Sequence, residues 1–540
     1  MQNLTVQKVC LALITLAFFV AAPWITSETL GGNSKPLLAI ASVAVVLLFV
    51  YGLGERCWWI IPFCLSVDGN LNFLPLNFSL QELAIMVVFC YLLFRVIFGL
   101  DVAWKLGPPL LWIPLAGVLA VVLYHWISSG DIGIKMLGGT GWGGRRYFKV
   151  FIAVLCIPLL ASFPGMKWQD LQKVPLVFFL GSFIDIIPEV LTTFIPAAAP
   201  LVWRVYSGVN LNEYGAALKG NFIGEQGITR IGALAKLGIA LSLVTICYFP
   251  ARTWLRPERL WVLPVILLGG LLCGLSGFRN YILRYFLTVM TGLYATIRIK
   301  AFFVLPVMLA AGLAVGFTQE TVINYPITLQ RALSFLPGNW SFRAKHEAEG
   351  SSEWRRRIQE LFFKEYFDQN PLLGKGYHFD PGLALTQTDI YLAVAKKQGQ
   401  DEYSDVRDFV EMRMPHEGPI HILLVTGVVG SCFFVLYCAS LLIYGIGSLW
   451  KTRPKEVAPI QIWAVAIILT QVVSFFTVFG DLTNFLIAVC PPSILLYRSV
   501  RLKLAEQITP PEAEEFAASE TPAVWGSAAH PLQIRQPPAS

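Results

Sequence analysis

Charged residues are scarce in this sequence, at 14% of 540 residues, whereas 56% of the residues are hydrophobic. Apolar runs of about 20 residues, long enough to cross a bilayer, recur from one end of the chain to the other. A soluble chain of this length would normally divide into several domains. The composition instead predicts an all-α polytopic membrane protein whose bundle of spans is interrupted by one long polar insert.

Several motifs of known chemistry are missing. The ten cysteines include no CxxC pair, and none lies in the long insert, so neither a disulfide framework nor a zinc site is indicated. The absence of DxD, HExxH and GxSxG argues against metal-dependent sugar transfer and serine hydrolysis. The stretch GGTGWGGRRYF does not fit the GxxxxGK[ST] pattern of a nucleotide-binding loop. We therefore expect no cofactor and no metal.

The net charge of +7 does not require a nucleic-acid partner, because cytoplasmic loops of membrane proteins collect Lys and Arg. About 12 to 14 spans are predicted. The apolar run near the N-terminus resembles a signal peptide, but the many spans after it favour a first span. A shorter apolar piece at 57–65 is a half-span or a re-entrant segment. The other predicted spans lie near 9–25, 36–53, 80–99, 107–128, 147–163, 171–197, 231–250, 259–277, 280–297, 300–317, 417–448, 459–478 and 482–498.

The short basic connections assign the sides of the membrane. They all fall on one side of the predicted bundle, and this side is expected to be cytoplasmic. They lie at 98–107, 164–173, 250–260, 296–300, 450–456 and after the last span. The predicted organisation is an N-terminal transmembrane bundle (1–317), a periplasmic loop containing helices (318–416), C-terminal transmembrane helices (417–498) and a disordered cytoplasmic tail (499–540). Both termini are cytoplasmic if the piece at 57–65 crosses.

Basic residues that remain on the outer side break this charge rule and are candidates for function. They are Arg145 and Arg146 in GGTGWGGRRYF, Arg230, Arg279 in LSGFRN, and the cluster at 355–357. Guanidinium groups bind phosphate oxygens in a bidentate fork, and glycines allow backbone N–H groups to approach an anion. Interfacial anchoring to lipid phosphates is the structural alternative for each of them.

The long insert contains its own predicted helix, SSEWRRRIQELFFKEYFDQNP. Ser351 or Ser352 is the expected cap, and the helix should stop at Asn370 and Pro371. Its apolar stripe and basic opposite face fit either a helix lying on the membrane surface or one that covers a substrate. The stripe consists of Trp354, Ile358, Leu361, Phe362 and Phe367.

Three other polar residues stand out. His416 precedes the span near 417–448, where a neutral imidazole beside arginines is suited to act as a base, although an interfacial histidine without function has the same pattern. Asp185 and Glu189 share one helical face, and carboxylates within a membrane are candidates for function. Alternatively, Pro188 breaks the helix between them, which would expose both to solvent.

Together these features resemble the O-antigen ligase and O-antigen polymerase superfamily of bacterial membrane glycosyltransferases. The resemblance covers roughly 200–445. It rests on TRIGALAKLGIAL with Arg230, on LSGFRNYIL with Arg279, on the basic helix that ends in NPLLGKGYH, and on PHEGPIHILLVTGVVG with His416. Glu417 stands where many members have Asn, and Asn280 where the corner usually has Gly.

The resemblance implies a membrane glycosyltransferase fold in the bacterial inner membrane with a periplasmic active face. The implied donor is a glycan on undecaprenyl diphosphate, and the implied acceptor is a hydroxyl of a glycan, lipid A core or glycoprotein. Transfer would invert the anomeric carbon without a metal. His416, Arg279 and Arg230 are the expected catalytic residues, and the expected substrate-binding residues are Arg145, Arg146, Arg355, Arg356 and Glu417.

Three alternatives remain at this stage. A polymerase of the same superfamily has the same motifs as a ligase, and the sequence leans only slightly towards a ligase. A transporter or flippase for a lipid-linked or acidic solute would be expected to show related halves with Gly/Pro-broken spans, and no convincing repeat is present. A membrane scaffold would use the polar tail at 503–540 as its partner site.

Overall fold

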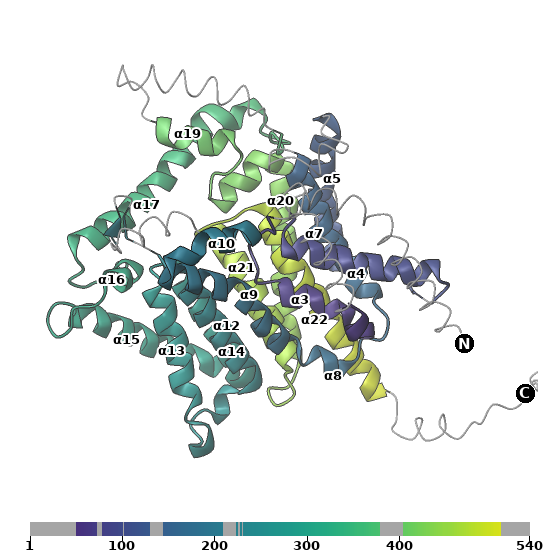
Figure 1. The fold of residues 1–540 in the computed structure, drawn as a ribbon, viewed down its shortest axis with the longest axis horizontal. Helices are drawn as coiled ribbons and strands as arrows, with labels where there is room; N and C mark the ends of the chain where they lie inside the picture. The colour runs from purple at the N-terminus through teal and green to yellow at the C-terminus, as the bar shows by residue number, and fades with distance from the viewer. Residues whose placement is uncertain are drawn as a thin grey trace, which may run out of the picture.

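The computed structural model describes residues 50–72, 78–100, 102–129, 144–208, 223–224, 227–228, 230–378 and 403–508. Within these ranges the regular structure is helical, and the two short strands are β1 (Ile223–Gly224) and β2 (Gly227–Ile228), which pair antiparallel. Eight helical stretches of the described chain are long and apolar enough to cross a membrane. The protein is therefore a multi-pass helical membrane protein (Figure 1).

Five membrane-length stretches are single helices: Leu80–Ile97 (α4), Pro109–Ser128 (α5), Val174–Phe194 (α9), Gly418–Lys451 (α20) and Pro459–Thr477 (α21). A sixth, Leu482–Leu504, is part of α22 (Leu482–Ile508). The other two combine several elements: Pro257–Leu275 contains η4 (Pro257–Arg259) and α13 (Val262–Leu275), and Arg279–Thr318 contains α14 (Arg279–Ile297), η5 (Arg298–Phe303) and α15 (Val304–Thr318). The shorter elements between them are η1 (Gly54–Trp59), α3 (Ile60–Cys64), α8 (Trp168–Leu171), η2 (Pro196–Ala198), α10 (Ala199–Val205) and η3 (Ala251–Thr253). The polar insert contains α16 (Ile327–Leu333), α17 (Phe342–Leu361), the π-helical turn η6 (Phe362–Tyr366), η7 (Phe367–Gln369) and α19 (Ser404–Glu411).

Two predicted spans form helices that are less suited to cross a bilayer alone. The helix α7 (Gly144–Ser162) begins with a basic turn, and α12 (Gly232–Tyr248) has only 17 residues. The predicted spans at 280–297 and 300–317 belong to one continuous helical stretch, and those at 9–25 and 36–53 lie wholly or almost wholly outside the described residues.

The connections predicted to be cytoplasmic lie at one end of the bundle, which we call the basic end. Arg298 donates a hydrogen bond to the Thr452 carbonyl, so the loops that follow α14 and α20 meet there. Arg498 of α22 donates to the Phe163 carbonyl at 3.0 Å, which brings the end of α7 to the same region. Figure 1 shows the insert helices α16, α17 and α19 gathered along one side of the bundle.

The short apolar piece at 57–65 connects the two ends of the bundle. Arg56 Nε lies 3.0 Å from Asp170 Oδ1, beside α8 at the basic end. Asp68 Oδ2, a few residues later, lies 3.7 Å from Lys236 Nζ in α12. The helices η1 and α3 thus carry the chain from the basic end into the bundle.

The centre of the bundle is aromatic and fully packed. Trp463 and Phe475 of α21 are buried, and the Phe475 ring lies 4.7 Å from that of Phe434 and 5.2 Å from that of Phe485. Because α20, α21 and α22 share this core, they hold the polar groups at their outer ends in fixed relative positions.

The insert helix begins earlier than predicted. The Ser341 hydroxyl caps α17 by accepting from the Ala344 N–H, so the expected cap at Ser351 or Ser352 was wrong. The residues that follow Ser341 are mostly good helix formers, and they extend the helix by more than two turns towards the N-terminus. The predicted end is confirmed, since η7 ends at Gln369. The predicted stripe is also confirmed: Ile358, Leu361 and Phe362 are buried, and Trp354 and Phe367 pack against them.

The segment NPLLGKGYH forms a backbone clamp on α20, which we define as residues 371–376 bonded to residues 424–429. Gly427 has φ 61° and ψ −167°, and this conformation breaks the helical hydrogen bonds of α20. Protein groups replace those bonds, as a break within a membrane helix requires. The four replacements are Lys375 N–H to Leu424 O (2.8 Å), Gly376 N–H to Val425 O (3.1 Å), Val428 N–H to Pro371 O (2.9 Å) and Val429 N–H to Leu372 O (3.0 Å).

We expect Gly427→Ala to destabilise the protein by on the order of 3 kcal/mol, through left-handed backbone strain and steric clash. A Cβ at this position would lie 2.4 Å from the Leu372 carbonyl carbon. The control is Gly447→Ala in the same helix, where no atom lies within 4 Å of the new Cβ and helix propensity favours alanine. Thermal unfolding in detergent should show a lower Tm for the first variant only. Equal Tm values for both variants would contradict the clamp.

Candidate functional site

A cavity of about 560 Å³ with several charged lining residues lies at the end of the bundle opposite the basic end. It is lined by α12, α14, α21 and the start of α22, with the loop at 65–68 and Arg355 of α17. Its charged lining residues are five cations and two carboxylates: Lys149, Arg230, Lys236, Arg284, Arg355, Asp68 and Asp481. This balance favours an anionic ligand.

Four arginines gather at this end, and we call them the arginine cluster: Arg230, Arg279, Arg331 and Arg355. Arg230 and Arg355 line the cavity, and both act electrostatically on Arg279 at the start of α14. Arg279 Nη2 donates to the Ala348 carbonyl of α17 at 2.6 Å. This bond ties the α13–α14 corner to the insert helix.

Arg331 of α16 is the member of the cluster that the sequence did not predict. It donates to the Gly277 carbonyl and pairs with Glu347, with Nε 3.1 Å from Oε2. Burial lowers the pKa of Arg331 to about 10, and the charges of Arg230 and Arg279 add to this shift. Such crowding of like charges is costly, and a bound anion would relieve it.

The structure does not bring Arg145 and Arg356 to the cavity. Arg145 is buried against Glu82, with 2.6 Å between Nη2 and Oε2, and its guanidinium carbon lies 4.3 Å from the centre of the Phe78 ring. Arg356 is not among the residues that line the cavity, and it pairs within its own helix with Glu353 and Glu360. Arg145 therefore joins α7 to α4, and within the 355–357 cluster only Arg355 lines the cavity.

His416 lies beside this cavity in a ring of aromatic side chains. Its ring centre is 5.3 Å from that of Phe479, which lines the cavity, and 5.5 Å and 6.0 Å from those of Phe409 and Trp354. Its backbone has φ 54°, a left-handed conformation that few residues other than glycine adopt. Strained backbone of this kind is concentrated at functional sites.

Burial and the charge of Arg146 favour the neutral form of His416. Burial lowers the pKa of His416; Asp481 opposes this shift and Arg146 adds to it. Arg146 also fixes the chain just before His416, because its Nη1 donates to the carbonyls of Met412 (3.3 Å) and Arg413 (2.9 Å). Arg146 thus positions His416 and is not a lining residue of the cavity.

Glu417 links the insert helix to the start of α20. Its carboxylate accepts a hydrogen bond from Gln359 of α17. Burial raises the pKa of Glu417, although the bond from Gln359 and the charge of Arg355 oppose the shift. Asn280, the second departure from the family pattern, lines the cavity and accepts from Ser474 Oγ at 3.0 Å.

Asp481 and His421 form a pair that sequence reasoning missed. Asp481 lines the cavity, and its Oδ2 lies 3.4 Å from Nε2 of the buried His421. Burial by itself would raise the pKa of Asp481, but His421, Arg146 and bonds from Thr483 and residue 484 hold it below the ordinary value. The available signal was the single acidic residue of FGDLTN, which lies in a predicted outer connection.

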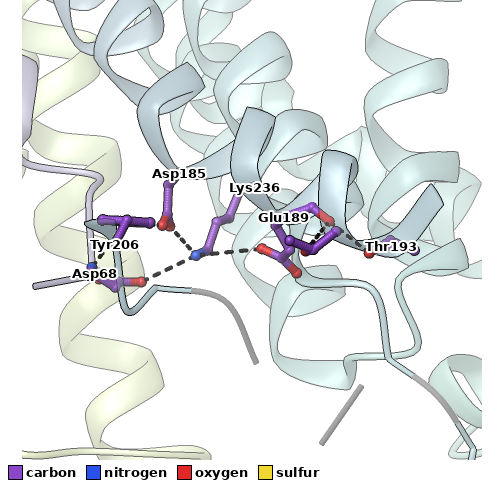
Figure 2. Close-up of polar contacts among 8 residues, drawn as sticks. Asp68, Asp185, Glu189, Thr193, Tyr206 and Lys236 are labelled. Carbon is purple, nitrogen blue, oxygen red and sulfur yellow. Dashed lines mark hydrogen bonds and ion pairs between the residues drawn. The ribbon is translucent and has the colours of Figure 1, made fainter. Parts of the chain in front are cut away.

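Asp185 and Glu189 are buried and paired, so the expectation that a break at Pro188 exposes them was wrong. The helix α9 continues through Pro188, and Lys236 of α12 lies between the two carboxylates (Figure 2). Lys236 contacts Asp185 directly, and its Nζ lies 3.9 Å from Glu189 Oε2. A lone lysine in an apolar segment was the sequence signal for this pairing.

The arrangement is suited to hold an anionic group beside a neutral imidazole. Within the described ranges, no group of three or more His, Cys, Asp or Glu side chains has an arrangement that would hold a metal ion. No protein family model matches this sequence, and no curated protein matches it.

Proposed function

We propose that this protein transfers a glycan from undecaprenyl diphosphate to an acceptor hydroxyl at the periplasmic face of the bacterial inner membrane. The observation that carries the proposal is the arginine cluster at a cavity that His416 adjoins, where burial lowers the pKa of His416 and its backbone is left-handed. The order of the motifs around Arg230, Arg279 and His416, which resembles O-antigen ligases and polymerases, supports the same activity.

The chemistry requires positive charge where the leaving group departs. The acceptor oxygen forms a bond to the anomeric carbon on the side opposite the diphosphate, which inverts that carbon. The bond between the anomeric carbon and the phosphate oxygen breaks, and its electron pair leaves with the diphosphate. The arginine cluster would stabilise that developing charge, and His416 would take the hydroxyl proton. Because guanidinium groups supply the charge, the proposed reaction needs no metal.

The distribution of charged loops supports the proposed sidedness. The loops at the basic end carry the Lys and Arg residues expected of cytoplasmic loops. The arginine cluster and His416 lie at the other end, which would face the periplasm.

The acceptor separates two forms of the activity. A ligase would pass the glycan to lipid A core or to a glycoprotein, and a polymerase would pass it to another glycan. The proposed form is a ligase, and the polymerase is the alternative within the same chemistry.

The proposal is tested in host membranes that contain or lack the protein. With the protein, we expect glycan to leave undecaprenyl diphosphate and appear on an acceptor; without it, the donor should accumulate. The mobility of the product on a gel identifies the acceptor. A chelator should leave the rate of transfer unchanged, and loss of transfer in the presence of a chelator would contradict the metal-free mechanism. Equal donor levels in both membranes would reject the activity and favour transport of a lipid-linked solute.

A further inference from the structure

A second charged group lines the same cavity, and we call it the Lys236 centre: Lys236, Asp68, Asp185, Glu189 and Tyr206. Figure 2 shows the ammonium group of Lys236 directed at all three carboxylates. Lys236 and Asp68 line the cavity, whereas the other members lie behind Lys236. The centre therefore presents an ammonium and a carboxylate to any ligand.

The buried members already neutralise Lys236. Asp185 accepts from both Lys236 and the Tyr206 hydroxyl. Glu189 also accepts from the backbone N–H groups of Gly232 and Ala233 at the start of α12, where a carboxylate is favoured. One ammonium thus faces three carboxylates, so the region has no surplus positive charge for an anionic ligand.

Asp68 adds exposed negative charge to this end of the cavity. Its side chain is 70% exposed, whereas Asp185 is almost fully buried. Its position is fixed by the next residue, because Gly69 N–H donates to Tyr206 Oη at 3.0 Å. A Cβ at Gly69 would lie 2.2 Å from the Tyr206 ring, so glycine is required there.

The cavity therefore has two electrically different regions. Among the described residues, the arginine cluster brings four cations together, with Glu347 paired to Arg331 and Glu417 under the charge of Arg355. At the Lys236 centre three carboxylates outnumber Lys236 and the nearby Arg284, whose guanidinium carbon lies 5.4 Å from the centre of the Tyr281 ring. Ser66, Ser182 and Tyr281 add neutral polar groups to the wall. The hydroxyl groups of a sugar carry no net charge and both donate and accept hydrogen bonds, so they can pair with the carboxylates and with the neutral polar groups of this wall.

We infer that the Lys236 centre binds an uncharged sugar of the glycan and, through Asp68, excludes sugars that carry a carboxylate or phosphate. This inference rests on the proposed function and specifies its substrate class. A like charge placed opposite a partly desolvated carboxylate weakens binding and gives specificity by repulsion. The arginine cluster would hold the diphosphate, while the Lys236 centre would select the sugar attached to it.

The test is a competition between two undecaprenyl diphosphate donors in one reaction with the full-length protein. One donor carries a hexose on the diphosphate, and the other carries the corresponding hexuronic acid. Because Asp68 is mostly exposed, the wild type should favour the hexose by about 5-fold, and Asp68→Asn should remove most of that preference. The control, Asp368→Asn, removes an exposed carboxylate of the insert that does not line the cavity and should leave the ratio unchanged.

A second variant acts in the opposite direction. Gln81 lines the cavity, and Gln81→Glu should increase the preference for the uncharged donor. If Asp68→Asn does not fold, this variant alone decides the question. Transfer by the wild type without preference, or ratios unchanged in folded Asp68→Asn or Gln81→Glu, would overturn the inference and leave the proposed function intact. Failure of the wild type to transfer either donor would instead overturn the proposed function.

Discussion

Replacing Arg279 with alanine is expected to lower glycan transfer by about 100- to 1,000-fold, the usual effect of removing one preorganised donor from a developing negative charge. Arg279 opens α14 and does not itself line the cavity, but the charges of the cavity-lining Arg230 and Arg355 act on it. Retaining the charge without the planar fork, in Arg279→Lys, should restore only part of the rate, because an ammonium cannot form a bidentate contact with a phosphate. The measurement is donor consumption in membranes at matched expression.

The matched control for Arg279 is Arg356→Ala. Arg356 carries the same charge at the same end of the protein, but it pairs within its own helix with Glu353 and Glu360, whereas Arg279 lies under the charges of the cavity-lining Arg230 and Arg355. Its removal should leave transfer unchanged. Because Arg279 also bonds the Ala348 carbonyl, thermal unfolding must show that Arg279→Ala remains folded. Equal transfer by the two folded variants would contradict the assignment of the leaving-group site.

The second large effect is expected at His416. His416→Ala should reduce transfer by about 100- to 10,000-fold, the range in which positioned general bases contribute. The His416 side chain is surrounded by aromatic side chains, and Arg146 fixes the backbone just before His416 by donating to the Arg413 carbonyl. Binding of the donor should change little, since the arginine cluster is intact. A folded variant with normal transfer would remove His416 from the mechanism.

The pH dependence provides an independent check of the same residue. Burial lowers the pKa of His416, so the neutral, basic form persists to lower pH than for an ordinary histidine. Transfer should therefore fall on acidification with a midpoint below 6.5, the ordinary value. The residual rate of His416→Ala should not show this acidic limb of the pH profile, that is, the fall in transfer on acidification. If the limb persists in that variant, Glu417, whose pKa burial raises, becomes the titrating group.

Several local features followed from the sequence because they depend on neighbours along the chain. The stripe of α17 follows from helical periodicity, and its end follows from Asn370 and Pro371. The start of α17 was missed because helix formers before Ser351 continue the helix back to Ser341. A break of α9 at Pro188 was the alternative to the predicted span at 171–197, but the helix continues through Pro188 and both carboxylates pair with Lys236.

The candidate site was predictable only in part. Arg279 and His416 stand at the ends of apolar segments, so hydropathy and the charge rule pointed to them. Arg331 lies in a short helix of the insert, and nothing in its local sequence pattern sets it apart from a surface arginine. Its role depends on Gly277 and Glu347, which fold around it.

The sequence by itself determined that the chain is a multi-pass helical membrane protein and that its unexplained charges gather at the end opposite the basic loops. The free energy of inserting a helix into lipid depends on the residues of that segment alone, so the linear pattern of hydrophobicity suffices to predict the spans. Only the tertiary structure decided which arginines face the cavity. Arg145 and Arg146 are neighbours, yet one is paired with Glu82 of α4 and the other holds the chain before His416. Such partners are distant in sequence, and the packing of the helices selects them.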